Sequence, residues 1–240
     1  PAWMNGVITD DPAAVDFEAL KAYRVTGAVK ASSTKERYVV SPGGRGEKED
    51  RPVGLWAEEE HLPGAGQAGG RGHRVPLHQP TAQEIAAMGV DGIMLSNGPG
   101  DPAENVEIIA NLREICKLGI PLFGICLGHQ LLALAHGFQT EKLKYGHRGA
   151  NQPVKNLETG RVYISSQNHG YAVVSGSIDG KTAKELFVNV NDGTCEGIRY
   201  LDCPAFSVQF HPEACGGPLD TQELFDQLFC HDEGGGTLCR

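Results

Sequence analysis

Residues 120–137 read IPLFGICLGHQLLALAHG, and this stretch decides the fold. Its first part, Ile120–Ile125, is an apolar run typical of a buried strand. Leu127–His136 has the length and composition of a buried helix, and Gly137 supplies its stop signal. The Gly-x-Cys-x-Gly pattern at 124–128 joins the two, which predicts a tight turn that lifts the Cys126 side chain above the end of a sheet.

Strands and helices alternate on both sides of this stretch. Before it, the pattern predicts a helix at 81–89, a buried strand at 91–96 and a helix at 103–118. After it, strand-like runs lie at 161–165, 171–174, 187–190, 197–200 and 205–210. A helix at 219–229 closes the pattern. The alternation predicts an α/β fold with parallel strands, and the strand-rich second half makes the central sheet mixed.

Composition narrows the class of protein. The chain has 240 residues, 40% of them hydrophobic, and a formal net charge of −9. The acidic balance argues against nucleic acid or an anionic membrane as the main partner, and no apolar run is long enough to span a membrane. The seven cysteines are odd in number and form no Cys-x-x-Cys pair. We therefore expect a reducing, cytoplasmic setting and no metal site.

Cys126 is the candidate nucleophile. The helix that follows it would direct its free N–H groups and positive end at the sulfur, which favours a thiolate. The N–H of Leu127 would then be placed to stabilise an oxyanion. The alternative is a buried structural cysteine between two packing glycines.

A thiolate nucleophile needs a base, and His211-Pro212-Glu213 directly follows the predicted strand at 205–210. Pro212 favours an extended conformation at His211, so His211 and Glu213 would share one face and the carboxylate could orient the imidazole. A His-x-Glu pair alone is weak evidence. The rival base, His169, has no carboxylate two residues on and is expected to be a contact residue.

Two polar strings accompany these residues. SNGPGDP at 96–102 predicts a rigid turn whose N–H groups could face a substrate, or else a plain surface turn. SQNHGY at 166–171 predicts either a hairpin turn or a substrate-contacting loop.

Taken together, the strings resemble the class I (triad) glutamine amidotransferases, and more narrowly the small subunits of carbamoyl-phosphate synthetases. The matching text is LSNGPGDP at 95–102, GICLGHQLLALA at 124–135, YGHRGANQPV at 145–154, SSQNHGYAV at 165–173, NDGTCEGIRY at 191–200 and SVQFHPEACGGPLDT at 207–221. The resemblance is nearly continuous from about residue 79 to 229. It implies a flavodoxin-like three-layer fold with a mixed, largely parallel central sheet.

The resemblance also implies a reaction. Cys126, His211 and Glu213 would form a Cys-His-Glu triad that hydrolyses L-glutamine to glutamate and ammonia through a γ-glutamyl thioester. The implied glutamine contacts are Gly98, Gly100, Leu127, Gln130, Asn168, Gly170 and Tyr171. The ammonia would pass to a large synthetase subunit that binds ATP and Mg²⁺, whereas this chain would hold no cofactor. The product, carbamoyl phosphate, would feed arginine or pyrimidine biosynthesis.

Three segments depart from the family pattern. Residues 1–40 resemble only the end of an N-terminal domain and its linker, although AYRVTGAVKASST at 22–34 is similar to the family. Residues 41–78 contain nine glycines and show no strand or helix period, which predicts loop or disorder and is consistent with out-of-frame translation. The tail at 230–240 does not match a terminal helix.

The anomalous segment 41–78 has a physical consequence. It stands where the family has its first strand, so we expect an unpaired position in the central sheet and marginal stability of the domain at 79–229. Three other functions stay open: an amidotransferase of anthranilate or GMP synthesis, a stand-alone γ-glutamyl hydrolase, and a non-enzymatic interaction subunit. GHRGANQPV argues against the first two.

Overall fold

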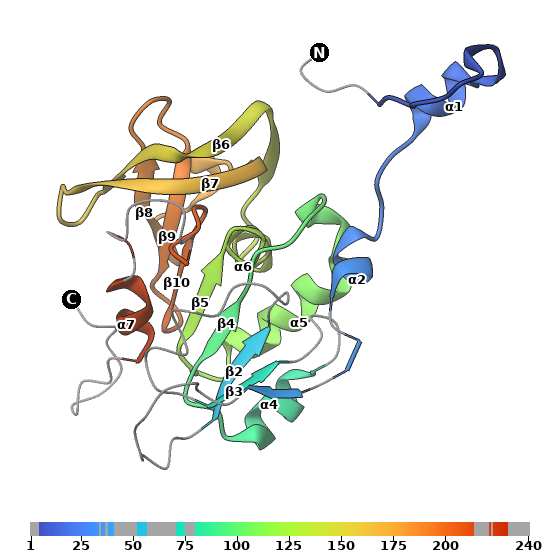
Figure 1. The fold of residues 1–240 in the computed structure, drawn as a ribbon. Helices are drawn as coiled ribbons and strands as arrows, with labels where there is room; N and C mark the ends of the chain where they lie inside the picture. Colours follow the sequence, from blue (N-terminus) through green and yellow to red (C-terminus); the bar gives the residue numbers. More distant parts are fainter. Residues whose placement is uncertain are drawn as a thin grey trace.

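The computed structural model describes residues 5–33, 35–36, 38–40, 52–56, 71–74, 80–213, 221 and 223–229. Within these ranges, ten strands form one mixed sheet in the order β1-β3-β2-β4-β5-β10-β9-β8-β6-β7 (Figure 1). The strands are β1 (Tyr38–Val40), β2 (Pro52–Trp56), β3 (Arg71–Arg74), β4 (Ile93–Leu95), β5 (Leu122–Ile125), β6 (Thr140–Asn156), β7 (Val162–Val173), β8 (Ala183–Asn189), β9 (Cys195–Tyr200) and β10 (Ala205–Val208). The predicted α/β fold with a mixed sheet is confirmed.

Parallel pairing is confined to one half of the sheet. The pairs β3–β2, β2–β4, β4–β5 and β5–β10 are parallel, whereas the pairs from β10 through β9, β8 and β6 to β7 are antiparallel, as is β1–β3. The carboxyl ends of β4, β5 and β10 therefore meet at one edge, where ligand sites of α/β sheets gather.

Helices cover the sheet on both faces, which gives three layers (Figure 1). The covering helices include α4 (Ala82–Met88), α5 (Val106–Cys116), α6 (Leu127–Ala135) and α7 (Glu223–Phe229), and α2 (Ala28–Ser32) lies close to α5. In contrast, α1 (Phe17–Ala22) projects away from the sheet. Short 3₁₀ turns lie at Pro12–Ala14, Pro102–Glu104 and Ser175–Ser177. Alternation along β4 explains the layers: Ile93 and Leu95 join the core with α4, α5 and α6, whereas Met94 joins the core with α7. Within the described residues, no helix is long and apolar enough to cross a membrane.

Local sequence signals account for the predicted helices. Thr81 caps α4 through a capping box with Glu84, and Gly89 ends it in the left-handed conformation. The helix predicted at 103–118 is divided into a 3₁₀ turn at Pro102–Glu104 and the helix α5. The Asp101 side chain accepts a hydrogen bond from the Ala103 N–H and so caps the 3₁₀ turn, which ends at Asn105 before α5 begins.

Two expectations are wrong. The segment 41–78 is not free of regular structure, because β2 and β3 lie in it, and β2 fills the position beside β4 that we expected to be unpaired. The rest of 41–78 and the tail 230–240 lie outside the described residues. The string at 166–171 is neither a turn nor a loop, because it lies inside the continuous strand β7.

The long strand β6 was not predicted. Most of its side chains are exposed or half-buried, so its sequence carries no alternation of apolar and polar residues. It pairs with β7, the next strand in the chain, and with β8, so its position is set by its strand partners.

Candidate functional site

Cys126 stands at the turn between β5 and α6. Its φ of 51° and ψ of −101° make it the one described residue other than glycine with a positive φ. Such backbone strain is typical of functional turns. The Cys126 N–H donates to the Val208 carbonyl at 2.8 Å, which fixes the turn to the end of β10. Leu127 is the first residue of α6, so its N–H has no partner within the helix. The predicted strand–turn–helix arrangement is confirmed.

The two glycines of this turn are required by close approach. A Cβ on Gly124 would lie 2.9 Å from the Gly128 carbonyl group, and a Cβ on Gly128 would overlap the Leu95 carbonyl oxygen. The Gly128 N–H also donates to Ser96 O at 3.1 Å. The Gly-x-Cys-x-Gly pattern therefore allows α6 to pack directly on the ends of β4 and β5.

We expect Gly128→Ala to lower the free energy of unfolding by about 1–3 kcal/mol, because the new methyl group forces β4 and α6 apart. Denaturant unfolding measures this change. The matched control is Gly176→Ala, where a Cβ meets no atom within 4 Å and the backbone needs no positive φ. Equal stability of the two variants would contradict the packing argument.

His211 and Glu213 lie together as predicted. The distance from His211 Nδ1 to Glu213 Oε1 is 2.8 Å, and their side chains are 14% and 4% exposed. A carboxylate accepts only, so Nδ1 carries the hydrogen. Burial alone would lower the pKa of His211, but the neighbouring Cys126 and Glu213 raise it to about 10. Nε2 is buried and makes no well-aligned hydrogen bond within the described residues.

The sheet brings the cysteine and the histidine together. Register pairs Ile125 of β5 with Val208 of β10, so Cys126 and the segment leading to His211 leave the sheet at the same edge. The His211 N–H also donates to Ser166 O of β7 at 2.9 Å, which fixes the histidine against that strand. Catalytic hydrogen bonds are often loose before substrate binds.

The remaining predicted contacts fall into two groups. Gly98 packs against the Leu127 side chain, since a Cβ there would lie 2.6 Å from Leu127 Cδ2. Gln130 donates through Nε2 to the Tyr171 carbonyl and to Gln209 Oε1, both at 2.9 Å. These contacts join the loop after β4, the start of α6 and β7.

The second group is more exposed. Gly100 has a φ of +95° and lies beside Ala28 of α2. Asn168 and Gly170 lie on β7 next to Arg148 of β6. Burial raises the pKa of Tyr171, and so does the neighbouring Asp101, which belongs to the 96–102 string. Gly100 is thus the predicted contact that faces α2.

Two histidines near the site, the buried His129 and the half-buried His147, were missed, and a third, His169, was expected only as a contact. His129 Nδ1 lies 2.8 Å from Ser207 Oγ, and His169 lies 2.7 Å from the Tyr171 carbonyl through Nδ1. His147 of β6 lies between two carboxylates, Asp192 at 2.9 Å and Glu196 at 3.2 Å, which raise its pKa to about 9. A lone histidine in a sequence carries no signal of such partners.

We expect the buried histidines to make the fold acid-sensitive. Burial lowers the pKa of His129 to about 3 and that of His169 to about 4. The unfolded chain therefore binds more protons than the folded one below pH 6.5. The stabilisation that depends on these two neutral rings is complete above that pH and is lost as the pH falls toward 3. Each group contributes a slope of about 1.4 kcal/mol per pH unit within its window. Urea unfolding between pH 7 and 4 measures it.

His129→Gln is the informative variant, because glutamine can still bond Ser207 and does not titrate. The stability of this variant should depend less steeply on pH than that of the wild type. Equal slopes would show that His129 is not held neutral in the folded state.

Comparisons with known proteins identify the family. The family model for "Glutamine amidotransferase class-I" matches residues 66–230. The chain belongs to the class I glutamine amidotransferases. The match begins at residue 66, within the segment that departs from the pattern of the carbamoyl-phosphate synthetase small subunits.

Curated relatives narrow the resemblance. The chain is 56% identical over 152 residues to the carbamoyl phosphate synthase small chain of Bacillus caldolyticus, covering 63% of this chain and 41% of that protein. It is 53% identical over 159 residues to the small chain of Methanopyrus kandleri, covering 66% and 44%. The chain thus spans less than half the length of these relatives.

Solved structures show the same fold. A protein from Thermoplasma acidophilum, described as a putative GMP synthase component, superposes with a TM-score of 0.63 at 18% identity, covering 76% of this chain and 94% of that one. A glutamine amidotransferase from Thermotoga maritima gives a TM-score of 0.52, also at 18% identity, covering 70% and 78%. At this identity the likeness shows the amidotransferase fold alone.

Proposed function

We propose that this chain hydrolyses L-glutamine and supplies the ammonia for carbamoyl phosphate synthesis. The observation that carries the proposal is the strained Cys126 turn beside a His211–Glu213 pair whose atoms lie 2.8 Å apart. The identity to carbamoyl phosphate synthase small chains supports the choice of product.

In the proposed mechanism, His211 holds the proton of Cys126, as its raised pKa favours, and the Cys126 thiolate attacks the side-chain amide carbon of glutamine. The tetrahedral oxyanion accepts a hydrogen bond from the Leu127 N–H, which has no partner within α6. His211 then gives the proton to the leaving nitrogen, so ammonia departs and a γ-glutamyl thioester remains. His211 next takes a proton from water as the hydroxide attacks the thioester, which releases glutamate and restores the thiolate beside protonated His211.

The other groups position the substrate. Glu213 keeps Nδ1 of His211 protonated, which leaves Nε2 to exchange protons. We assign glutamine contacts to the seven residues proposed above: Gly98, Gly100, Leu127, Gln130, Asn168, Gly170 and Tyr171. The hydrogen bonds of Gln130 to Tyr171 O and Gln209 hold two sides of this set together.

The partner in this proposal is a large synthetase subunit that binds ATP and Mg²⁺ and receives the ammonia. A cytoplasmic location, with products entering arginine or pyrimidine synthesis, follows from the same assignment. Pathway and location stay predictions.

The test combines the full chain with the large subunit of a similar synthetase and measures carbamoyl phosphate. With glutamine, we expect product only when this chain is added, because only it would release ammonia. With ammonium chloride, we expect the large subunit to make product without it. Glutamate release that is unaffected by the large subunit, with no carbamoyl phosphate, would point to a stand-alone hydrolase instead.

A further inference from the structure

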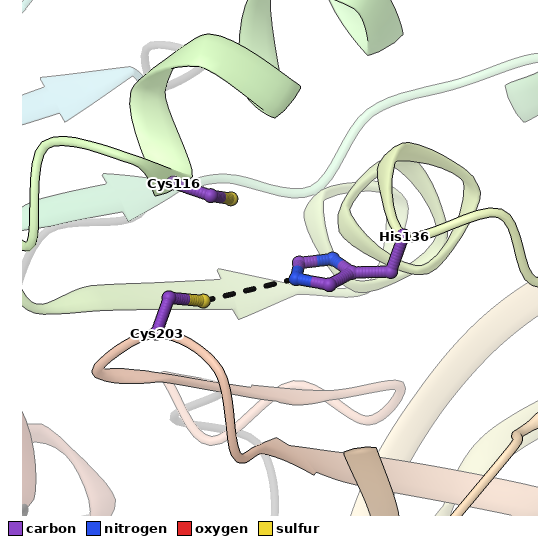
Figure 2. Close-up of side chains that lie close together, drawn as sticks. All are labelled: Cys116, His136 and Cys203. Atoms are coloured by element: carbon purple, nitrogen blue, oxygen red, sulfur yellow. Dashed lines mark hydrogen bonds between the residues drawn. The ribbon is translucent and has the colours of Figure 1, made fainter. Parts of the chain in front are cut away.

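A second cluster of reactive side chains lies at the end of the sheet opposite Cys126. Cys116 is the last residue of α5, His136 follows the last residue of α6, and Cys203 lies in the turn before β10 (Figure 2). Their ligand atoms all lie within 4.8 Å of one another. The proposed glutaminase mechanism uses none of them, and they line a cavity of about 320 Å³.

The distances match those around a tetrahedral metal ion. His136 Nε2 lies 3.7 Å from Cys203 Sγ and 3.4 Å from Asp202 Oδ1. Ligands bonded to one tetrahedral Zn²⁺ lie about 3.6 Å apart for sulfur and nitrogen and about 3.3 Å for nitrogen and oxygen. Asp202 is not one of the three residues whose ligand atoms all lie within 4.8 Å of one another, so its half-exposed side chain would have to turn toward the sulfurs to serve as a fourth ligand.

His136 is oriented as a metal-binding histidine. Its Nδ1 lies 2.9 Å from the Leu132 carbonyl oxygen, which only accepts, so Nδ1 carries the hydrogen. In the neutral ring, Nε2 then presents its lone pair to Cys203, as Figure 2 shows. A backbone carbonyl that fixes the tautomer in this way is the usual outer partner of a metal-bound histidine. The ring is also held by Tyr200, with centroids 4.2 Å apart.

The electrostatic surroundings suit a cation with thiolate ligands. Cys116 and His136 stand at the carboxyl-terminal ends of α5 and α6, which carry partial negative charge. Two thiolates and the Asp202 carboxylate around a divalent ion leave one net negative charge, and Arg113 and Lys117 line the same cavity.

We propose that Cys116, His136, Cys203 and Asp202 bind one Zn²⁺ ion. Two thiolates and one imidazole are ligands that Zn²⁺ prefers, and a set of four protein ligands is typical of a structural site. The ion would tie the ends of α5 and α6 to the turn before β10. Binding releases the two thiol protons, so charge and atoms balance.

The cluster of His147, His169 and Glu196 does not qualify on the same grounds. Both ring nitrogens of His147 already face carboxylates, Asp192 and Glu196. His169 is bonded to the Tyr171 carbonyl and to Gln167.

The test is a Co²⁺ titration of the full chain after reduction and treatment with a chelator. Cys215, Cys230 and Cys239 are first replaced by serine, which removes the cysteines outside the described residues. We expect one equivalent of Co²⁺ to bind, with thiolate-to-cobalt charge-transfer bands, tetrahedral d–d bands and release of two protons. Zn²⁺ should displace the Co²⁺ and raise the melting temperature.

In this background, Cys116→Ser and Cys203→Ser should each weaken Co²⁺ binding by more than about tenfold, and the double variant should lose the charge-transfer bands. Asp202 is half-exposed, so Asp202→Asn tests a ligand without disturbing the core, and it should also weaken binding. Cys195→Ser, which changes a cysteine outside the cluster, should leave the spectrum unchanged.

Two outcomes would overturn the proposal. One is the absence of charge-transfer bands in the reduced chain that retains Cys116 and Cys203. The other is persistence of the bands in the double variant. The readout does not depend on glutamine hydrolysis, so the metal site and the proposed function can fail separately.

Discussion

Replacing Cys126 with serine is expected to reduce glutamine hydrolysis by at least about a thousandfold. Serine keeps the size and position of the side chain but has a far higher pKa than a thiol, so the attacking anion is not formed. The strained turn, with its φ of 51°, should be kept, because the glycines at 124 and 128 set the approach of α6. Glutamate release, measured with and without a large subunit, reports the change.

The matched control is Cys195→Ser. Cys195 lies in β9, is fully buried and bonds the Gly197 carbonyl through its sulfur at 3.7 Å, a contact that a hydroxyl can keep. This variant should retain activity within a few fold if it folds, which circular dichroism checks. Glutamate release that is unchanged in Cys126→Ser would contradict the covalent mechanism.

Replacing His211 with asparagine is expected to lower the rate of glutamate release by about 10²–10⁴-fold, because no group remains to carry the proton between sulfur, ammonia and water. The side chain of asparagine can still bond Glu213, so the local backbone should be preserved. Steady-state kinetics should show the loss mainly in kcat.

Glu213→Gln separates orientation from proton transfer. The amide can still contact Nδ1, but it removes a negative charge that helps raise the pKa of His211. The alkaline limit of kcat/KM should therefore move to lower pH. Glu158→Gln, which removes a carboxylate bound to Arg199, serves as the control and should leave the profile unchanged. An identical profile for all three proteins would remove Glu213 from the proposed mechanism.

The central part of the fold was predictable because its signals are local. The apolar run before Gly124, the glycines around Cys126 and the capping box at Thr81 each specify their own turn or helix. The pair His211–Glu213 was also predictable, since Pro212 sets the backbone that puts both side chains on one face.

Other features depend on partners elsewhere in the chain. β6 has no apolar period and is held by the adjacent strand β7 and by β8, so its own sequence does not reveal it. The strand at Pro52–Trp56 was missed because its glycine and proline argue against a strand, whereas pairing with β4 decides its conformation. The cluster of Cys116, His136 and Cys203 arises from three elements that are widely separated in sequence, so spacing rules for metal sites could not find it.

The pairing of β5 with both β4 and β10 also bears on how the chain reaches its folded state. A ribosome makes β4, β5 and α6 before β10, so the second edge of β5 stays open until β10, the last strand of the described residues, has emerged. Until then, an apolar edge is exposed to misassociation and His211 is absent from the side of Cys126. Incomplete chains should therefore be prone to aggregation and unable to hydrolyse glutamine, so that activity reports completed synthesis through residue 213.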